Sequence, residues 1–219
     1  MPRRLQKLRA RSDDEKLLRR ATILGAARVL LQKTDWTELR TSDVARRAGM
    51  AKASVFRYFG KKEELVLAVY LAELGAVFAT LERELDGARS VSDVEIARRV
   101  AATLVDHPLF VRLSTAVHAA LARRITVASA RRFKGELLGQ LAGAARLLEA
   151  KLPALPPGAG LRLLLRCHAA MIGLSQLADS PPSVEAALQG GGLDVFRIDF
   201  AKEIEEVFLA LLKNLEASP

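Results

Sequence analysis

Apolar side chains recur at helical spacing along most of this 219-residue chain. In the C-terminal stretch they lie three or four positions apart, at Phe196, Phe200, Ile204, Phe208 and Leu211. One face of an α-helix repeats at this interval, whereas a half-buried strand needs strict alternation, which we do not find. Leu, Ala and Arg dominate the composition, while β-branched and aromatic residues are scarce, which also favours helices. The sequence therefore predicts an all-α protein of about nine helices, without internal repeats.

Helix-start and helix-end signals set the expected boundaries. A basic, mobile arm of residues 1–12 precedes a first helix that begins at the acidic triplet from Asp13 and ends near Lys33. Thr41 or Ser42 is expected to cap a second helix, which Gly49 closes. Segments rich in Pro and Gly predict loops at 153–160 and 180–192. The other helices are expected at 52–59, 62–86, 92–106, 108–121, 126–152, 161–178 and 194–215.

The cellular environment is constrained by the absence of three kinds of signal. The single cysteine, Cys167, excludes an internal disulfide framework and any multi-cysteine metal site. No uninterrupted apolar run approaches the roughly 18 residues of a membrane span. The N-terminal region also lacks the apolar segment of a signal peptide. We expect a soluble cytoplasmic protein with no membrane partner.

Charge is distributed unevenly along the chain. Residues 1–62 hold 17 Lys and Arg against six Asp and Glu, a net charge of +11, while the remainder carries −2. A basic module on a near-neutral body is the electrostatic footprint of nucleic-acid binding. A solvated surface with a basic tail is the alternative. Charge alone does not show whether the binding partner is DNA, RNA or an anionic membrane.

Two short helices joined by a glycine turn, following a longer helix, predict a helix-turn-helix. In this motif the second helix enters the major groove and the first braces it. The stretch from Thr41 to Val69, TSDVARRAGMAKASVFRYFGKKEELVLAV, closely resembles the DNA-binding signature of TetR-type transcriptional regulators. They share the Ala-Gly turn, the aromatic end of the recognition helix and the Lys-Glu-Glu-Leu helix start. The resemblance covers about 70 residues and implies a DNA-binding domain at 1–62 and a helical regulatory domain at 63–219.

The resemblance also implies which residues face DNA. Lys52, Ala53 and Ser54 begin the recognition helix and would face base edges, because lysine can read guanine and a small side chain permits close approach. Phe56 and Arg57 would line the groove. In this chain Phe56 stands where the family usually has Tyr, so it offers only apolar contact.

Backbone contacts are implied for three further residues. Thr41 would donate to a phosphate from a helix start, and Tyr58 and Lys62 would hold further phosphates. Val55 and Phe59 are expected to pack in the core. Ala51 stands where the family has a capping hydroxyl, so the recognition helix is expected to lack a side-chain cap.

The regulatory domain of the resembled family binds a small-molecule effector and dimerises. Here the two long helices at 161–178 and 194–215 would pair with their copies as a homodimer, and a two-fold dimer reads a palindromic operator. We expect an apolar or weakly polar effector, because few acids are expected on the inward faces. The candidate lining residues, for each of which plain core is the alternative, are His107, Phe110, Leu113, His118, Phe133, Leu137, Met171 and Gln176.

The sequence therefore predicts a dimeric, ligand-responsive repressor in the cytoplasm, at the bacterial nucleoid when bound to DNA. The alternative is a nonspecific architectural DNA-binding protein without an effector. An enzyme is not expected, since we find no nucleophile elbow, phosphate-binding glycine loop or paired catalytic carboxylates. The histidines lack metal-ligand spacing, so neither a metal nor a cofactor is expected.

Overall fold

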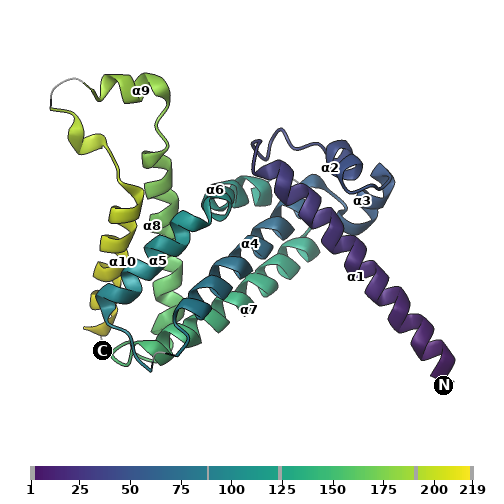
Figure 1. Ribbon diagram of the computed structural model, residues 1–219, viewed down its shortest axis with the longest axis horizontal. Coiled ribbons are helices and arrows are strands. Elements are labelled where there is room, and N and C mark those ends of the chain that lie inside the picture. Colours follow the sequence, from purple (N-terminus) through teal and green to yellow (C-terminus); the bar gives the residue numbers. More distant parts are fainter. Residues whose placement is uncertain (1–2, 88, 123–124, 190–191, 218–219) are drawn as a thin grey trace. The chain divides into compact units, whose positions relative to one another are not determined.

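The computed structural model describes residues 3–87, 89–122, 125–189 and 192–217. These ranges contain ten α-helices, one short 3-10 helix and no strand (Figure 1). The predicted all-α class is confirmed, with one short helix more than expected. The chain forms two compact units, the first made of Met1–Tyr70 with Ala116–Ala130 and the second of Leu71–Thr115 with Arg131–Pro219.

The first unit is built on α1 (Arg3–Leu31), α2 (Thr41–Arg47), α3 (Lys52–Phe59) and the start of α4 (Lys62–Glu84). Its core is formed by apolar side chains at helical spacing. The Arg20 guanidinium lies 5.2 Å from the ring centre of Phe59, so α3 also packs against α1 through a cation–π contact. Side chains no more than 5% exposed in this core include Ile23, Ala27, Leu31, Val44, Val55, Phe59, Leu65 and Val69.

Helix α1 begins at Arg3, ten residues before the predicted start at Asp13. The predicted mobile arm is therefore wrong from Arg3 onward, while Met1 and Pro2 lie outside the described residues. Arg, Leu, Gln, Lys and Ala are strong helix formers, and no Gly or Pro interrupts them, so the helix continues upstream. Within α1, Asp13 pairs with Lys16 instead of serving a helix start.

The second unit contains α5 (Asp93–Asp106), α6 (Pro108–Ala122), α7 (Val127–Lys151), α8 (Ala159–Ala178), α9 (Pro182–Ala187) and α10 (Phe200–Glu216). Helix α10 packs against both α5 and α8. Its apolar stripe is buried at Ile204, Phe208, Leu212 and Leu215. Of the five residues whose helical spacing indicated this helix, Ile204 and Phe208 are buried, Phe200 and Leu211 are half-buried, and Phe196 is exposed outside α10.

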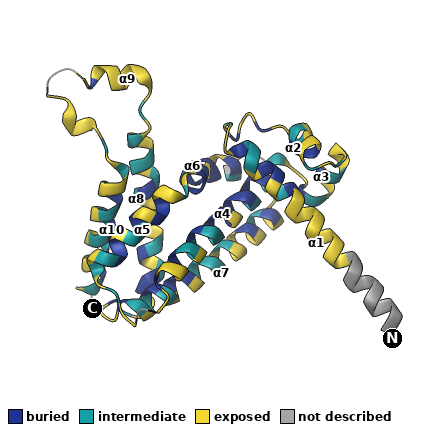
Figure 2. Cartoon of the chain, in the orientation of Figure 1, coloured by how far each residue is buried: buried dark blue, intermediate teal, exposed yellow. Residues whose placement is uncertain are grey.

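The predicted loop at 180–192 contains a short helix. Pro182 stands at the start of α9, where its fixed φ favours a helical first turn. After a 3-10 turn at Asp194–Phe196, α10 begins at Phe200 instead of Asp194. Asp199 is the cap, since its carboxylate accepts a 3.2 Å hydrogen bond from the Lys202 amide. No residue of α9 or of the 3-10 turn is buried (Figure 2).

Helix α4 is long and mainly apolar, but Glu73 interrupts it, so it contains no uninterrupted apolar run of membrane-span length. Among the described residues it is the one helix long and apolar enough to cross a membrane, with a mean hydropathy of 1.8 over its best 18-residue window. However, 61% of that window is buried inside the fold. The helix is apolar because it lies in the core.

Candidate nucleic-acid interface

The turn between α2 and α3 fixes where the second short helix starts. Gly49 adopts φ +66°, a left-handed conformation that side chains with a Cβ rarely adopt. The Gly49 amide donates to the Arg46 carbonyl at 3.2 Å, and the Met50 amide donates to the Ala45 carbonyl at 2.9 Å. These two bonds form a Schellman motif that ends α2. The predicted glycine stop is confirmed, and with it the helix-turn-helix.

Helix α3 has one buried and one exposed face. Val55 and Phe59 are 1% and 5% exposed, which confirms them as core. Phe56 is 43% exposed although it is a large aromatic residue. Four of the predicted base-facing residues are therefore exposed together on one short helix: Lys52, Ala53, Phe56 and Arg57. Ser54 and Tyr58 are half-buried at its edges.

The starts of α2 and α3 have no side-chain caps. Arg40, not Thr41 or Ser42, holds the extended cap conformation of α2, so the predicted cap is wrong and Thr41 is already the first helical residue. Ala51 caps α3 without a side-chain bond, as predicted. Free first-turn amides remain at both helix starts, because they have no intrahelical acceptor. Such amides bind anions such as phosphate.

The basic side chains near this surface differ in how they contact the rest of the protein, and Arg57 donates a 3.4 Å hydrogen bond to the Ser54 hydroxyl. Lys52 lies 5.8 Å from the ring centre of Phe56, and Arg57 lies 6.0 Å from that of Tyr58. Lys62 is held more firmly, because its ammonium donates to the Thr37 carbonyl at 2.7 Å. It also lies 5.6 Å from the ring centre of Trp36, which is buried. A lysine ammonium has three donors, so two remain for other acceptors.

Family models match nearly all of the chain. The model of the bacterial regulatory proteins of the tetR family matches residues 23–69, and that of the tetracyclin repressor-like C-terminal domain matches residues 71–219. The chain belongs to the TetR family. Members of this family are transcriptional regulators, typically ligand-responsive repressors, that bind DNA, act as dimers and are generally not enzymes.

Solved structures of other proteins share the fold at low sequence identity. A protein from Rhodococcus sp. RHA1 described as a transcriptional regulator aligns with TM-score 0.63 and 16% identity, covering 91% of this chain and 98% of its own. The TetR family repressor AlkX from Dietzia sp. aligns with TM-score 0.55 and 16% identity, over 90% and 96%. The fatty acid degradation regulator FadR from Bacillus halodurans aligns with TM-score 0.52 and 14% identity, over 90% and 96%. A search of curated proteins found no match.

The eight candidate effector residues of this TetR-family chain lie in different environments. Phe110, Leu113, Phe133 and Met171 are buried. Leu137 and His107 are half-buried, whereas His118 and Gln176 are exposed. His118 belongs to the first unit, and the other seven belong to the second. His107 forms a 3.2 Å hydrogen bond with Thr80 of α4.

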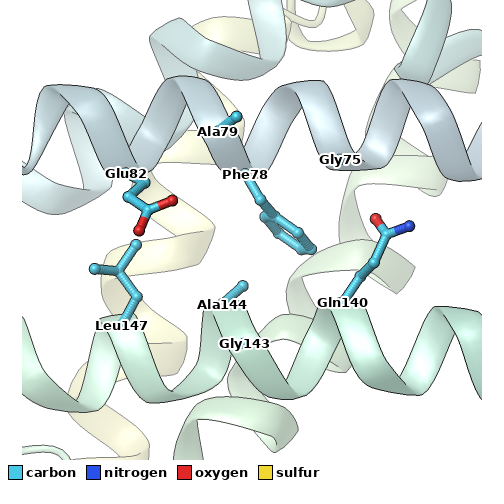
Figure 3. Close-up of a pocket in the computed structure, with 8 residues that line it drawn as sticks. All are labelled: Gly75, Phe78, Ala79, Glu82, Gln140, Gly143, Ala144 and Leu147. Carbon is cyan, nitrogen blue, oxygen red and sulfur yellow. The ribbon is translucent and has the colours of Figure 1, made fainter.

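A hollow of about 320 Å³ lies between α4 and α7, and none of the eight candidates lines it (Figure 3). Phe78 of α4 and Gln140 of α7 both point into the space between the helices. The Gln140 amide nitrogen donates to the Leu71 carbonyl at 3.2 Å, while its oxygen is buried with no hydrogen-bond partner in the described structure. The hollow is therefore lined mostly by apolar groups, with the Gln140 amide oxygen and the Glu82 carboxylate as its polar acceptors. Its lining is Gly75, Phe78, Ala79, Glu82, Gln140, Gly143, Ala144 and Leu147.

Sequence reasoning missed several polar groups that the fold buries. Glu73 of α4 is only 2% exposed, although few acids were expected on the inward faces of this domain. Thr103 of α5 is 1% exposed, and its hydroxyl has no hydrogen-bond partner among the described residues. Ser129 of α7 is also buried and donates to Glu64 of α4. A break in the apolar row of each helix is the only signal that the sequence offers for these groups.

The described residues contain no group of three His, Cys, Asp or Glu side chains that could hold a metal ion. Burial raises the pKa of the Cys167 thiol to about 12, so this cysteine stays protonated at neutral pH. A protonated, buried thiol is a poor nucleophile. We therefore assign Cys167 to the core of α8.

Proposed function

We propose that this TetR-family chain is a homodimeric repressor that binds a palindromic operator in double-stranded DNA and is released by a small apolar or weakly polar effector. The exposed face of α3 carries this proposal. The fold presents Lys52, Ala53, Phe56 and Arg57 to solvent directly after a braced helix, inside a unit of strong positive charge. This is the geometry by which a recognition helix reads the major groove.

Residues at the edge of α3 are suited to hold the DNA backbone. Thr41 begins α2 and brings free amides and a hydroxyl to one helix start. Lys62 keeps two ammonium donors after bonding Thr37, and Tyr58 and Ser54 are half-exposed beside Arg57. We propose that Thr41, Tyr58 and Lys62 bind phosphates, while Lys52, Ala53, Ser54, Phe56 and Arg57 face bases.

The proposed dimer seam is the outward face of α8 and α10, the helices at the predicted ranges 161–178 and 194–215. Leu165 and Leu177 of α8 are 52% and 61% exposed, which leaves apolar surface for a second copy. A single short recognition helix contacts too few base pairs for specificity, whereas two copies related by a two-fold axis read both halves of a palindrome.

The apolar interior of the second unit indicates the class of effector. Its interior is mainly apolar, with candidates such as Phe110, Phe133 and Met171 buried. The buried Thr103 hydroxyl and Gln140 amide oxygen have no hydrogen-bond partner in the described residues, so each can anchor a polar group. Few polar anchors in an apolar site are typical of the site for a small, weakly polar ligand.

We propose that the protein acts in the cytoplasm, and at the nucleoid when it is bound to DNA.

Selection of bound duplexes from a random DNA pool, with the purified full chain at near-physiological salt, tests this function. Recovery of a palindrome supports a sequence-specific dimer and supplies a labelled operator for effector screening. Since the neighbours AlkX and FadR are connected with n-alkane and fatty acid degradation, a medium-chain alkane and a fatty acid are the first probes. Recovery of featureless sequences would favour a nonspecific DNA-binding protein instead.

A further inference from the structure

A hydrogen bond joins the start of α7 to the start of α4 inside the first unit. The Ser129 hydroxyl donates to the Glu64 carboxylate with an Oγ–Oε1 distance of 2.6 Å. The two residues are 65 positions apart in the sequence, yet both belong to the unit that carries α2 and α3. Because Ser129 is only 8% exposed and the acceptor is charged, water competes weakly for this bond.

Ser129 is fixed by the first turn of its own helix. Its amide donates to the Thr126 hydroxyl at 3.1 Å, and the two hydroxyls lie 3.0 Å apart. Thr126 therefore caps α7, and the Ser129 side chain has one orientation, toward Glu64. A carboxylate beside a helix start is also favoured by the helix dipole.

Glu64 is placed between α7 and the end of the recognition helix. Its second carboxylate oxygen lies where a Cβ on Gly60 would be only 3.0 Å away, so the side chain packs directly over this glycine. Gly60 ends α3 with φ +56°. Glu64 also follows Lys62, the proposed phosphate ligand, within the first turn of α4. One carboxylate thus touches the end of α3 and the start of α7.

Helix α7 continues from this contact into the second unit. Its first residues, up to Ala130, belong to the first unit, and from Arg131 onward the same helix belongs to the second. We propose that Ser129 is a positioning residue that, through Glu64, holds the end of α3 and the start of α4 in the conformation that binds DNA, so that a displacement of α7 alters operator affinity. This inference rests on the proposed DNA-binding function and adds a contact through which the second unit can alter it.

Four variants of the full chain test the coupling. Ser129→Ala removes the donor, Glu64→Gln removes the charge but keeps the shape, and the double variant completes a cycle. Thr115→Ala is the matched control, since its hydroxyl bonds to the Arg112 carbonyl within its own helix. Affinity is measured on a duplex recovered from the random-pool selection, and amide hydrogen exchange is followed with and without that duplex.

We expect Ser129→Ala to weaken operator binding about three- to tenfold, because only part of the free energy of one charge-assisted hydrogen bond is transmitted to DNA binding. The double variant should lose less affinity than the product of the two single losses, because both changes break the same bond. In the wild type, operator binding should slow exchange at the amides of Ser129 and Ala130, as reciprocity of coupling requires. Ser129→Ala should abolish this slowing, and Thr115→Ala should retain it.

Several outcomes would overturn the inference. One is that both single variants bind the operator with wild-type affinity. Another is that the variants lose free energy of unfolding while operator affinity and amide exchange stay unchanged, because a bond with a purely structural role predicts this result. Multiplicative losses in the double variant would also contradict it. If Ser129→Ala does not fold, Glu64→Gln carries the same comparison. A wild-type chain that binds no duplex would refute the proposed function itself, which the other outcomes leave intact.

Discussion

Replacing Lys52 by alanine should relax base preference while leaving the recognition helix folded. The side chain is exposed, and its recorded contact is the Phe56 ring, 5.8 Å from the ammonium to the ring centre. An exposed cation–π contact of this kind contributes about 0.5–1 kcal/mol, so the free energy of unfolding should change little. The loss should therefore fall on DNA recognition.

The size of that loss follows from the contact that lysine makes with guanine. A good base contact discriminates by about 1–3 kcal/mol, which corresponds to about 5- to 150-fold per half-site. Replacing Lys62 by alanine should act differently, because a phosphate contact carries no sequence information. In a dimer that change removes two phosphate contacts, so the slope of log K against log salt should become shallower by about 1.8.

Fluorescence anisotropy on the selected operator, and on duplexes with each base pair changed, separates the two roles. Titrations at several salt concentrations give the slope for each variant. Lys134→Ala is the matched control, since its ammonium also lies 5.8 Å from a neighbouring ring centre, that of Phe133, but on α7 of the other unit. Lys62 also bonds Thr37, so the folded fraction of that variant is measured first.

The reasoning would be refuted if Lys52→Ala weakened all duplexes equally and flattened the salt dependence as Lys62→Ala does. It would also be refuted if Lys134→Ala had the same effect as Lys52→Ala. Either result would reduce the face of α3 to an unspecific source of positive charge.

Three further predictions concern stability, reactivity and assembly. Ala51→Ser should raise the free energy of unfolding by about 1 kcal/mol, because residue 51 already has an extended cap conformation without a side-chain bond; an unchanged urea midpoint would contradict this. Cys167 should resist thiolate-directed reagents at pH 8 until the protein is denatured. Rapid labelling of Cys167 in the folded protein would contradict its assignment to the core. Burial raises the pKa of this thiol from 9.0 to about 12, so its contribution to the free energy of unfolding should be lost as pH rises above about 9. Leu165→Glu should yield monomers in light scattering, and an intact dimer would exclude this part of α8 from the seam.

Local sequence signals predicted the elements that local physics determines. Gly49 ends α2 because its backbone conformation requires glycine, and the helical spacing of Val55 and Phe59 predicts their burial. Such features depend on neighbours within one or two turns. The extension of α1 to Arg3 was missed because basic residues were interpreted as an arm, although each is also a good helix former.

Contacts between distant segments could not be predicted in this way. Ser129 and Glu64 meet because the starts of α7 and α4 both lie in the first unit, and no spacing in the sequence indicates which turns become neighbours. Glu73 interrupts an apolar helix as an exposed residue would, yet the fold buries it. Predicting these groups requires the packing of whole helices, which one sequence without a structure does not specify.

The first unit is not contiguous in the sequence, and this restricts how the protein can be recombined. Its residues come from Met1–Tyr70 and from Ala116–Ala130, and each junction between the units falls inside a helix. A chimaera joined at residue 70 would give the new DNA-binding region a foreign version of 116–130, and with it a foreign partner for Glu64. Exchanging both stretches together would keep that partner. Crossover sites that preserve function should therefore be combined at all three junctions, after residues 70, 115 and 130, and an insertion at any of them would rotate one part of a helix relative to the other.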